Sequence, residues 1–541
     1  MAGSRYPLSA LLLLLIALPS AAQEAPADDE TMETDPAVIE QKVEKIIEEY
    51  EALRASADLE PTRRRRELAR RLGTLPCEDA VKTLHKLIEN DRDLRTVIFA
   101  MNSLCRIGDI KAIQRMYKHV LKESRKTVLP DYFGPAVARA RDPQVGPWLV
   151  DKVLDHPNKF LSLSAVEAVG ALRTSLAREP LFKMLEKEQR KTKPDIHPVY
   201  EILRALGMIG GEGVKDLLDA AAADDDWRIR EAAVEVLLMH HRDEPTIELM
   251  RKLLKDEVAI VREVAAVSAG EHKLEELFPE LILLMREGNL RAKHKSYEAM
   301  KAISSQDFGY APDVWAKWLQ DKKKGELTEA GDIKDRQTIT VATYYDFKIF
   351  SDRVLFVVDV SGSMKWPDYR PNRIDVAKRE LVKAIRNLDE KTLFNVATFA
   401  GHVNMWNKKG EVPATSQNKK EALEWAEDSL LPRGATNTYD ALMLGLELNP
   451  QIDTVFFLSD GLPSTGKYEL PEEILVKLRY ANRFRKVIFN TVALAMGRPS
   501  IEKAEKYEDP EEMAAFMKMI ADENGGVCVD IRQPPLDLRE A

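Results

Sequence analysis

The stretch that decides the fold is RVLFVVDVSGSMK, residues 353–365. Its apolar run, Val354–Val358, is rich in β-branched residues, which is typical of a strand buried on both faces of a parallel sheet. The run ends at Asp359, and Ser361 and Ser363 follow it closely. Open α/β sheets bind their ligands beyond the carboxyl ends of such strands. The stretch therefore predicts a doubly wound α/β domain with a site that begins at Asp359.

The chain beyond Asp359 alternates between helical and strand patterns, which predicts a parallel doubly wound sheet. Helices are expected over Arg373–Asn387, Lys419–Asp428, Tyr439–Leu448, Pro471–Ala481 and Pro510–Asn524, and strands over Thr392–Phe399, Val403–Trp406, Thr454–Leu458, Val487–Leu494 and Val527–Asp530. Thr338–Tyr345 is β-branched and aromatic, so we expect a strand at the edge of this domain or against its neighbour. These elements place the α/β domain at residues 338–532.

Two later stretches offer further oxygen ligands. RGATNTYDAL, residues 433–442, presents Thr436 on a glycine-containing loop, and VFFLSDGLPSTG, residues 455–466, is a second buried strand that delivers Asp460. Hydroxyl and carboxylate oxygens without His or Cys favour Mg²⁺ over Zn²⁺. Two carboxylates that converge repel by about 4 kcal/mol at ~4 Å and an effective dielectric near 20, and a divalent ion between them removes that cost. Taken alone, D-x-S-x-S also suits an ordinary turn.

Together these stretches resemble the von Willebrand factor type A family, whose metal-ion-dependent adhesion site uses D-x-S-x-S, a Thr and an Asp in this order. The resemblance implies five metal ligands: Asp359, Ser361, Ser363, Thr436 and Asp460. It also implies a bound Mg²⁺, with Mn²⁺ or Ca²⁺ as alternatives, and a protein partner whose acidic side chain completes the coordination. In the family the Thr joins the metal when the partner binds. Ala435 stands where the family usually has a second Gly, which is tolerated unless that position needs a positive φ.

One motif points elsewhere. Gly461–Lys467 nearly matches the phosphate-binding pattern G-x-x-x-x-G-K-[S/T] and follows a strand. Tyr468 replaces the hydroxyl that would hold Mg²⁺, and Pro463 removes a backbone N–H. The metal-site interpretation explains Asp460 and its loop better.

The amino-terminal half, from about residue 61 to 319, is predicted to be helix after helix. Similar segments recur every ~30–40 residues, a period typical of helical repeats. Small residues sit among Val and Leu in these segments: 164–172, 200–209, 228–237, 261–269 and 294–303. A helix pair of this kind cannot bury its apolar stripe alone, so we expect an all-α solenoid that resembles HEAT or armadillo-like repeats, with an irregular bundle as the alternative. We place it at residues 36–320, with Asp35 capping the first helix, and a linker at 321–337.

The first residues predict export. Arg5, the apolar run 8–18 and Ser20-Ala21-Ala22 form a signal peptide over residues 1–22, with an uncleaved anchor as the alternative. Residues 23–35 are an acidic, disordered leader and residues 533–541 a tail. No other segment is apolar enough to span a membrane. We therefore expect an exported protein of the periplasm, cell envelope or extracellular space. The pairing of helical repeats with a type A domain resembles proteins of bacteria with elaborate cell envelopes, which implies a bacterial source.

Charge and cysteines restrict the partners. A net charge of −9 argues against nucleic acid, so Arg63–Arg66 with Arg70 and Arg71 are expected to form a solvated helix face. The cysteines number three, which excludes a disulfide-stapled scaffold. Cys77 and Cys105 either pair or are simply buried.

No catalytic pattern stands out. None of the nine His residues lies in a recognised motif, and His402, the nearest to the metal site in sequence, is expected to be a solvated loop residue. We therefore expect a non-enzymatic binding, adhesion or scaffold protein whose helical repeats add a second protein-binding surface. The alternative is a non-catalytic regulatory or assembly subunit for an ATPase or protease encoded elsewhere. A hydrolase with a convergent site is a third interpretation.

Overall fold

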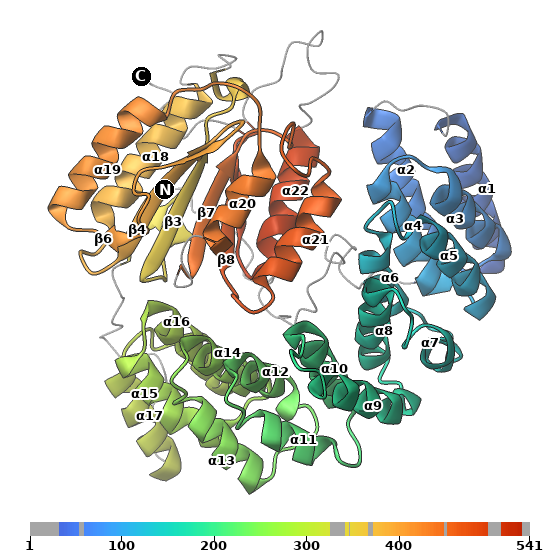
Figure 1. Cartoon of the computed structure of the whole chain (residues 1–541), viewed down its shortest axis with the longest axis horizontal. Helices are drawn as coiled ribbons and strands as arrows, with labels where there is room; N and C mark the ends of the chain where they lie inside the picture. The colour runs from blue at the N-terminus through green and yellow to red at the C-terminus, as the bar shows by residue number, and fades with distance from the viewer. Residues whose placement is uncertain are drawn as a thin grey trace.

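The computed structural model describes residues 32–53, 59–324, 341–345, 347–365, 372–447, 452–495 and 510–532. The predicted signal peptide, most of the leader, most of the linker and the C-terminal tail lie outside these residues. Within them, an array of helices curves around a carboxy-terminal α/β domain (Figure 1). The predicted fold class, an all-α solenoid followed by a doubly wound α/β domain, is confirmed.

The solenoid is built from α-helices with two short 3₁₀ turns between them. Its helices are α1 (Pro36–Leu53), α2 (Leu59–Leu72), α3 (Glu78–Asn90), α4 (Leu94–Ile107), α5 (Ile110–Glu123), α6 (Leu129–Val137), α7 (Val145–Lys152), α8 (Lys159–Ala171), α9 (Arg178–Gln189), α10 (Ile196–Ile209), α11 (Val214–Ala221), α12 (Trp227–Leu237), α13 (Glu244–Leu253), α14 (Ala259–Glu271), α15 (Phe278–Glu287), α16 (Leu290–Ser304) and α17 (Pro312–Lys324). Asp35 accepts a hydrogen bond from the Ala37 N–H at 2.9 Å, so the predicted cap of the first helix is present.

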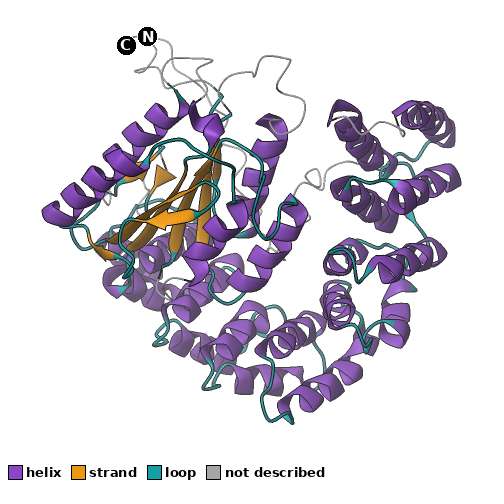
Figure 2. Cartoon of the chain, turned by 45° about the horizontal axis from the view of Figure 1, so that its top comes forward, coloured by secondary structure: helices purple, strands orange, loops and turns teal. Residues whose placement is uncertain are grey.

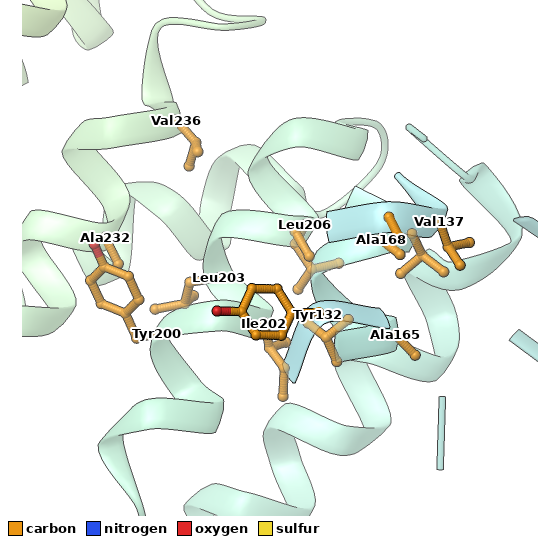
Figure 3. Close-up of a cluster of buried hydrophobic side chains, with 14 of the residues drawn as sticks. Tyr132, Val137, Ala165, Ala168, Tyr200, Ile202, Leu203, Leu206, Ala232 and Val236 are labelled. Carbon is orange, nitrogen blue, oxygen red and sulfur yellow. The ribbon is translucent and has the colours of Figure 1, made fainter. Parts of the chain in front are cut away.

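The helices stack as repeats. The even-numbered helices from α4 to α16 each pack on the next one, α4 on α6, α6 on α8 and so on. Figure 3 shows part of this layer, with Tyr132 on α6, Ala165 on α8, Leu206 on α10 and Ala232 on α12 within one apolar cluster. Because each helix contacts mainly its neighbours in the series, the array is a solenoid and not an irregular bundle.

Small residues allow the close helix contacts. A Cβ added at Gly170 of α8 would lie 2.8 Å from Cα of Ala205 in α10. A Cβ added at Gly270 of α14 would likewise lie 2.8 Å from Cα of Ala299 in α16. The small residues in the repeated segments therefore set the spacing of the even-numbered helices.

The end of the solenoid differs from the prediction. Helix α17 continues through Lys324, beyond the expected boundary at residue 320. Lys322, Lys323 and Lys324 form its last turn, where the helix dipole favours positive charge. Lys322 also pairs with Glu275 at 2.7 Å. These residues are helical, and the predicted linker begins later than we expected.

The α/β domain has one main sheet between two layers of helices, as Figure 2 shows in orange and purple. Its strands are β3 (Arg353–Asp359), β4 (Leu393–Phe399), β5 (Val403–Met405), β6 (Val412–Pro413), β7 (Thr454–Ser459), β8 (Ile488–Ala493) and β9 (Cys528–Asp530), and its helices are α18 (Arg373–Asn387), α19 (Ser416–Ser429), α20 (Thr438–Glu447), α21 (Pro471–Asn482) and α22 (Pro510–Glu523). The path of the sheet is β5-β4-β3-β7-β8-β9, and β6 pairs with β4. β5 and β6 are antiparallel to β4, and the other pairs are parallel.

The central strand β3 is buried on both faces, as its unbroken apolar run predicts. Phe356 and its neighbours in alternation pack toward α18 and α19, and Val357 packs toward α20, α21 and α22. The strand predicted at Thr338–Tyr345 is shorter in the structure. Within the described residues it is β1 (Thr343–Tyr344), which forms an antiparallel pair with β2 (Phe347–Lys348), separate from the main sheet. Among the described residues, no helix has the length and apolar character needed to cross a bilayer.

The solenoid holds the α/β domain by its amino edge and by α21 and α22. Asp352 and Asp453 directly precede β3 and β7, and they meet the start of α16: the Leu290 N–H donates to Asp352 Oδ2 at 2.6 Å, and Arg291 donates to the carbonyl oxygen of Asp453 at 3.0 Å. On α21, the carbonyl oxygen of Glu472 accepts a hydrogen bond from the Tyr132 hydroxyl at 3.0 Å. The carboxyl edge of the sheet, where Asp359 lies, is the opposite edge.

Ion pairs dominate this docking interface. Arg95 donates to Glu472 and to Glu512, at 2.7 Å in each case, from a side chain that is only 7% exposed. Further cross-domain pairs among the described residues are Arg63–Glu511, Arg63–Glu512, Arg66–Glu512, Arg483–Glu201, Lys486–Glu231 and Lys486–Glu235. The expectation of a solvated arginine face on α2 is therefore wrong for Arg63 and Arg66, because the α/β domain supplies acidic partners that sequence alone does not place there. It is also wrong for Arg65, whose side chain is buried against Asp91 within the solenoid.

Candidate metal site

The site begins where β3 ends. Asp359 is fully buried, and its two oxygens accept different hydrogen bonds: Oδ1 from the Ser361 N–H at 2.7 Å and Oδ2 from the Ser459 hydroxyl at 2.6 Å. Ser459 is the last residue of β7, so the two central strands hold this carboxylate between them. The carboxylate is fixed by the ends of β3 and β7 and has little freedom to turn.

The neighbouring strand end brings the second carboxylate. Asp460 follows β7 directly, and its Oδ1 accepts from the Ser363 hydroxyl at 2.8 Å and from the Ser361 hydroxyl at 3.4 Å. The two hydroxyl oxygens are 3.1 Å apart. Ser361, Ser363 and Asp460 therefore converge on one small volume beside Asp359.

Thr436 reaches the same volume from the loop before α20. A Cβ added at Gly461 would lie 3.9 Å from Oγ1 of Thr436 and 4.0 Å from Oγ of Ser363, so both hydroxyls face the space that this glycine leaves open. The Thr436 N–H donates to the Ser464 hydroxyl at 2.9 Å, and the Ser464 N–H donates to the Thr436 carbonyl oxygen at 3.0 Å. All five residues that the sequence suggested are thus brought together at the carboxyl edge.

The loops are joined to each other by their backbones. The Gly362 N–H donates to the carbonyl oxygen of Gly434 at 3.0 Å, and Gly434 has a φ of 71°. Ala435 is not among the residues with positive φ. Since the left-handed conformation falls on the glycine, the Ala at the next position is compatible with this backbone.

The electrostatics of the site follow from burial. Removal from water and the nearby Asp460 carboxylate raise the pKa of Asp359 to about 7, although hydrogen bonds from Ser459 and Ser361 oppose the shift. Burial also raises the pKa of Asp460, and here the guanidinium of Arg373 and the Ser363 hydroxyl oppose it. Ionising both buried carboxylates at once is costly in free energy. When both are ionised, the site therefore has a deficit of positive charge.

Arg373 is the residue that the sequence analysis missed. Its Nη1 donates to Oδ2 of Asp460 at 2.8 Å, and the two side chains are 6% and 0% exposed. The available signal was a basic residue at the first position of a helix, where the dipole favours acidic residues. That position follows the D-x-S-x-S loop, so a basic residue there indicates a role in the site and not in helix stability.

The donor set fits a hard divalent cation. It consists of two carboxylates and three hydroxyls, the oxygen ligands that Mg²⁺ accepts, usually together with water. Among the described residues there is no cluster of three or more His, Cys, Asp and Glu side chains suited to a metal. A metal at this edge would therefore rest on the hydroxyls of Ser361, Ser363 and Thr436 as much as on Asp359 and Asp460.

Other sequence features do not form a second site. The ring of His402 is exposed. Lys467 lies over the ring of Tyr468 at 5.4 Å, and the next helix begins only at Pro471, so no helix start faces a phosphate at this loop. Cys77 and Cys105 are free thiols.

A cavity of about 560 Å³ lies at the docking interface. Its wall carries both signs of charge, which pair with one another: Arg291 with Glu263 at 2.6 Å, and Lys486 with Glu235 at 2.9 Å. This balance favours no class of ligand.

Comparisons with known proteins agree with this division of the chain. Residues 354–462 match the von Willebrand factor type A domain, and residues 192–270 match HEAT repeats. Mouse inter alpha-trypsin inhibitor heavy chain 4 is 30% identical over 128 residues, which is 22% of this chain and 13% of that protein. Human inter-alpha-trypsin inhibitor heavy chain H6 is 27% identical over 150 residues, which is 25% of this chain and 11% of that protein. The chain thus spans only a small part of these relatives.

Among solved structures, a von Willebrand factor type A protein from Catenulispora acidiphila is 19% identical, with a TM-score of 0.28 over 35% of this chain and 40% of that one. The Ro (RSR) protein of Deinococcus radiodurans is 13% identical, with a TM-score of 0.20 over 93% of this chain and 96% of that one. At such scores neither structure bears on function.

Proposed function

We propose that this protein, which carries a von Willebrand factor type A domain behind a HEAT-repeat solenoid, is a non-enzymatic binding protein that holds a protein partner through a Mg²⁺ ion. Domains of this type typically mediate protein binding and often carry a divalent cation. The observation that carries the proposal is the pair of buried carboxylates, Asp359 and Asp460, beside three converging hydroxyls.

Each residue has a distinct role in this proposal. The hydroxyls of Ser361, Ser363 and Thr436 would hold the ion, and the carboxylates of Asp359 and Asp460 would balance its charge. The metal supplies an open coordination position that attracts an anionic oxygen. An acidic side chain of the partner, presented at the carboxyl edge, fits this position.

The docking geometry supports the same assignment. The solenoid contacts the amino edge of the sheet and the α21–α22 side, through residues such as Arg95, Tyr132 and Arg291. The carboxyl edge is not part of these contacts. The even-numbered helices contact the chain's own α/β domain. The additional partner-binding surface that we expect on the repeats would therefore lie on the face of the solenoid that points away from this domain.

The site of action belongs to the proposal as well. We propose that the chain is exported to the periplasm, cell envelope or extracellular space, on the strength of the segment 1–22. The alternative is a regulatory or assembly subunit for an ATPase or protease. In both cases the chain itself recognises a partner and catalyses no reaction.

The test is capture of partners from an envelope extract onto the mature protein, once in Mg²⁺ and once in EDTA. Asp359→Ala removes one buried carboxylate of the site, and Glu390→Ala removes an exposed one on the opposite, amino edge. We expect a band with the wild type and Glu390→Ala in Mg²⁺ only, and none with Asp359→Ala. If the captured protein is an ATPase or a protease, the result favours the alternative. If the same band is captured in EDTA and by Asp359→Ala, the result contradicts the metal-dependent function.

A further inference from the structure

Arg373 occupies a position that its own helix does not favour. It is the first residue of α18, where the positive end of the helix dipole disfavours a cation. Its side chain is nevertheless buried, 6% exposed, and directed at Oδ2 of Asp460. The ion pair with Asp460 therefore helps to hold this guanidinium in a position that the helix dipole disfavours.

The two oxygens of Asp460 have different neighbours. Oδ1 accepts from the hydroxyls of Ser361 and Ser363, which are candidate metal ligands, whereas Oδ2 accepts from Arg373. The guanidinium is thus bonded to the oxygen that the hydroxyls do not use. It can keep this contact while Oδ1 faces a metal.

The charge balance gives the arginine a function. Asp359 and Asp460 together carry two negative charges when ionised, and Arg373 leaves one of them uncompensated. A divalent ion then gives the site one net positive charge, which favours an acidic side chain of a partner. Without Arg373, the metal-loaded site would be neutral.

We propose that Arg373 is a resident counter-cation of this site: it keeps the two carboxylates together when metal is absent, moderates the affinity for the metal, and gives the metal-loaded site its positive charge. This inference rests on the proposed function. Charge repulsion between the guanidinium and the ion weakens metal binding, so the ion is held reversibly.

The test compares Arg373→Gln with Arg373→Lys, which keeps the charge, by isothermal titration with MgCl₂ and by thermal unfolding in EDTA. We expect Arg373→Gln to unfold several degrees lower in EDTA and to bind Mg²⁺ at least about tenfold more tightly than the wild type, since both changes follow from the lost positive charge. Arg373→Lys should stay within about threefold of the wild type, because the like charge at that position is retained.

A charge-restoring variant keeps the test decisive. If Arg373→Gln does not fold in EDTA, the double variant Arg373→Gln/Asp359→Asn, which has the net charge of the wild type, should fold. If neither variant folds, the protein requires Arg373 for packing and not for its charge, and the inference is overturned. The inference is also overturned if the wild type binds Mg²⁺ and Arg373→Gln binds it no more tightly. That result does not contradict the proposed function. A wild type that binds no Mg²⁺ overturns the proposed function itself.

Discussion

The two edges of the α/β sheet both bury charge, and they do so differently. At the docking interface, acidic side chains mostly meet a basic partner: Glu472 and Glu512 share Arg95, and Lys486 pairs with Glu235. At the carboxyl edge, Asp359 and Asp460 share hydroxyls and one guanidinium. The first arrangement is largely complete within the chain. The second has an excess of negative charge and is therefore suited to an added cation.

The pKa values follow the same contrast. Arg204, Lys486 and Arg483 hold the pKa of Glu235 well below its usual range, in spite of burial. Burial and Asp460 instead raise the pKa of Asp359 to about 7. A raised carboxyl pKa does not by itself mark a site, because burial also raises the pKa of Glu231 to about 7 at the docking interface.

The largest expected effect comes from breaking the docking interface. Arg95→Ala should lower the free energy of unfolding by about 3–5 kcal/mol, because it leaves Glu472 buried without its cation, whereas Glu512 keeps Arg66. Denaturant unfolding measures this, with Lys82→Ala as the control: Lys82 lies in an exposed ion pair and should cost about 0.5 kcal/mol or less. Equal losses in the two variants would show that the buried pairs do not hold the domains together.

The next effect separates the two carboxylates of the site. In EDTA, Asp460→Ala should lower the free energy of unfolding by about 2–3 kcal/mol, because the buried Arg373 then loses its ion pair with Asp460. Asp359→Ala should be stable to within about 1 kcal/mol of the wild type, because lost hydrogen bonds are offset by relief of carboxylate repulsion. Thermal unfolding in EDTA compares them, and a more stable Asp460→Ala would contradict the assigned role of Arg373.

A smaller effect concerns the hydroxyl that we expect to act when a partner binds. Thr436→Ala should weaken partner binding about tenfold, which is ~1.4 kcal/mol, and metal binding less. Titration with Mg²⁺ and with the captured partner separates the two affinities, and Thr465→Ala, a half-buried threonine of the neighbouring loop, is the control. Equal loss of both affinities argues against a role specific to the bound state.

The smallest effect tests Glu167, one of several carboxylates at the docking interface whose pKa is raised. Burial and the charge of Glu201 raise the pKa of Glu167 to about 7. The charged or titratable groups around Glu167 are Asp131, His197, Glu201, Arg204, Arg479 and Arg483. A raised carboxyl pKa stabilises the fold fully below the ordinary value of 4.5, and this contribution is lost as pH rises through about 7.

The free energy of unfolding should therefore fall between about pH 5 and 8 by on the order of 1 kcal/mol from this group. Glu167→Gln remains neutral and should remove that part of the pH dependence. Denaturant unfolding of both proteins at each pH measures the difference. Parallel pH profiles would mean that Glu167 does not titrate in this range.

Much of the α/β domain could be predicted because its signals are local. The apolar run of β3, the helix that starts at Pro471 and the two strand ends at Asp359 and Asp460 depend only on periodicity and on where polar residues follow strands. Since parallel strands end at one edge, Asp359, Ser361, Ser363 and Asp460 could be placed together before any contact was known, and the family resemblance added Thr436.

The docking of the two domains could not be predicted in this way. Arg66 and Glu512 are far apart in sequence, and each resembles an ordinary solvated helix residue until the other is placed beside it. Arg373 was missed for a related reason, because its partner Asp460 arrives from another strand. Charge pairing over long sequence separations leaves no periodic pattern for sequence analysis to detect.

The measurement that tests the central claim most directly is isothermal titration of the mature wild-type protein and of Asp359→Ala with MgCl₂. Our account predicts saturable binding of one Mg²⁺ per chain to the wild type, and no such binding to Asp359→Ala. Equal binding by the two proteins, or none by either, would contradict a metal site at the carboxyl edge.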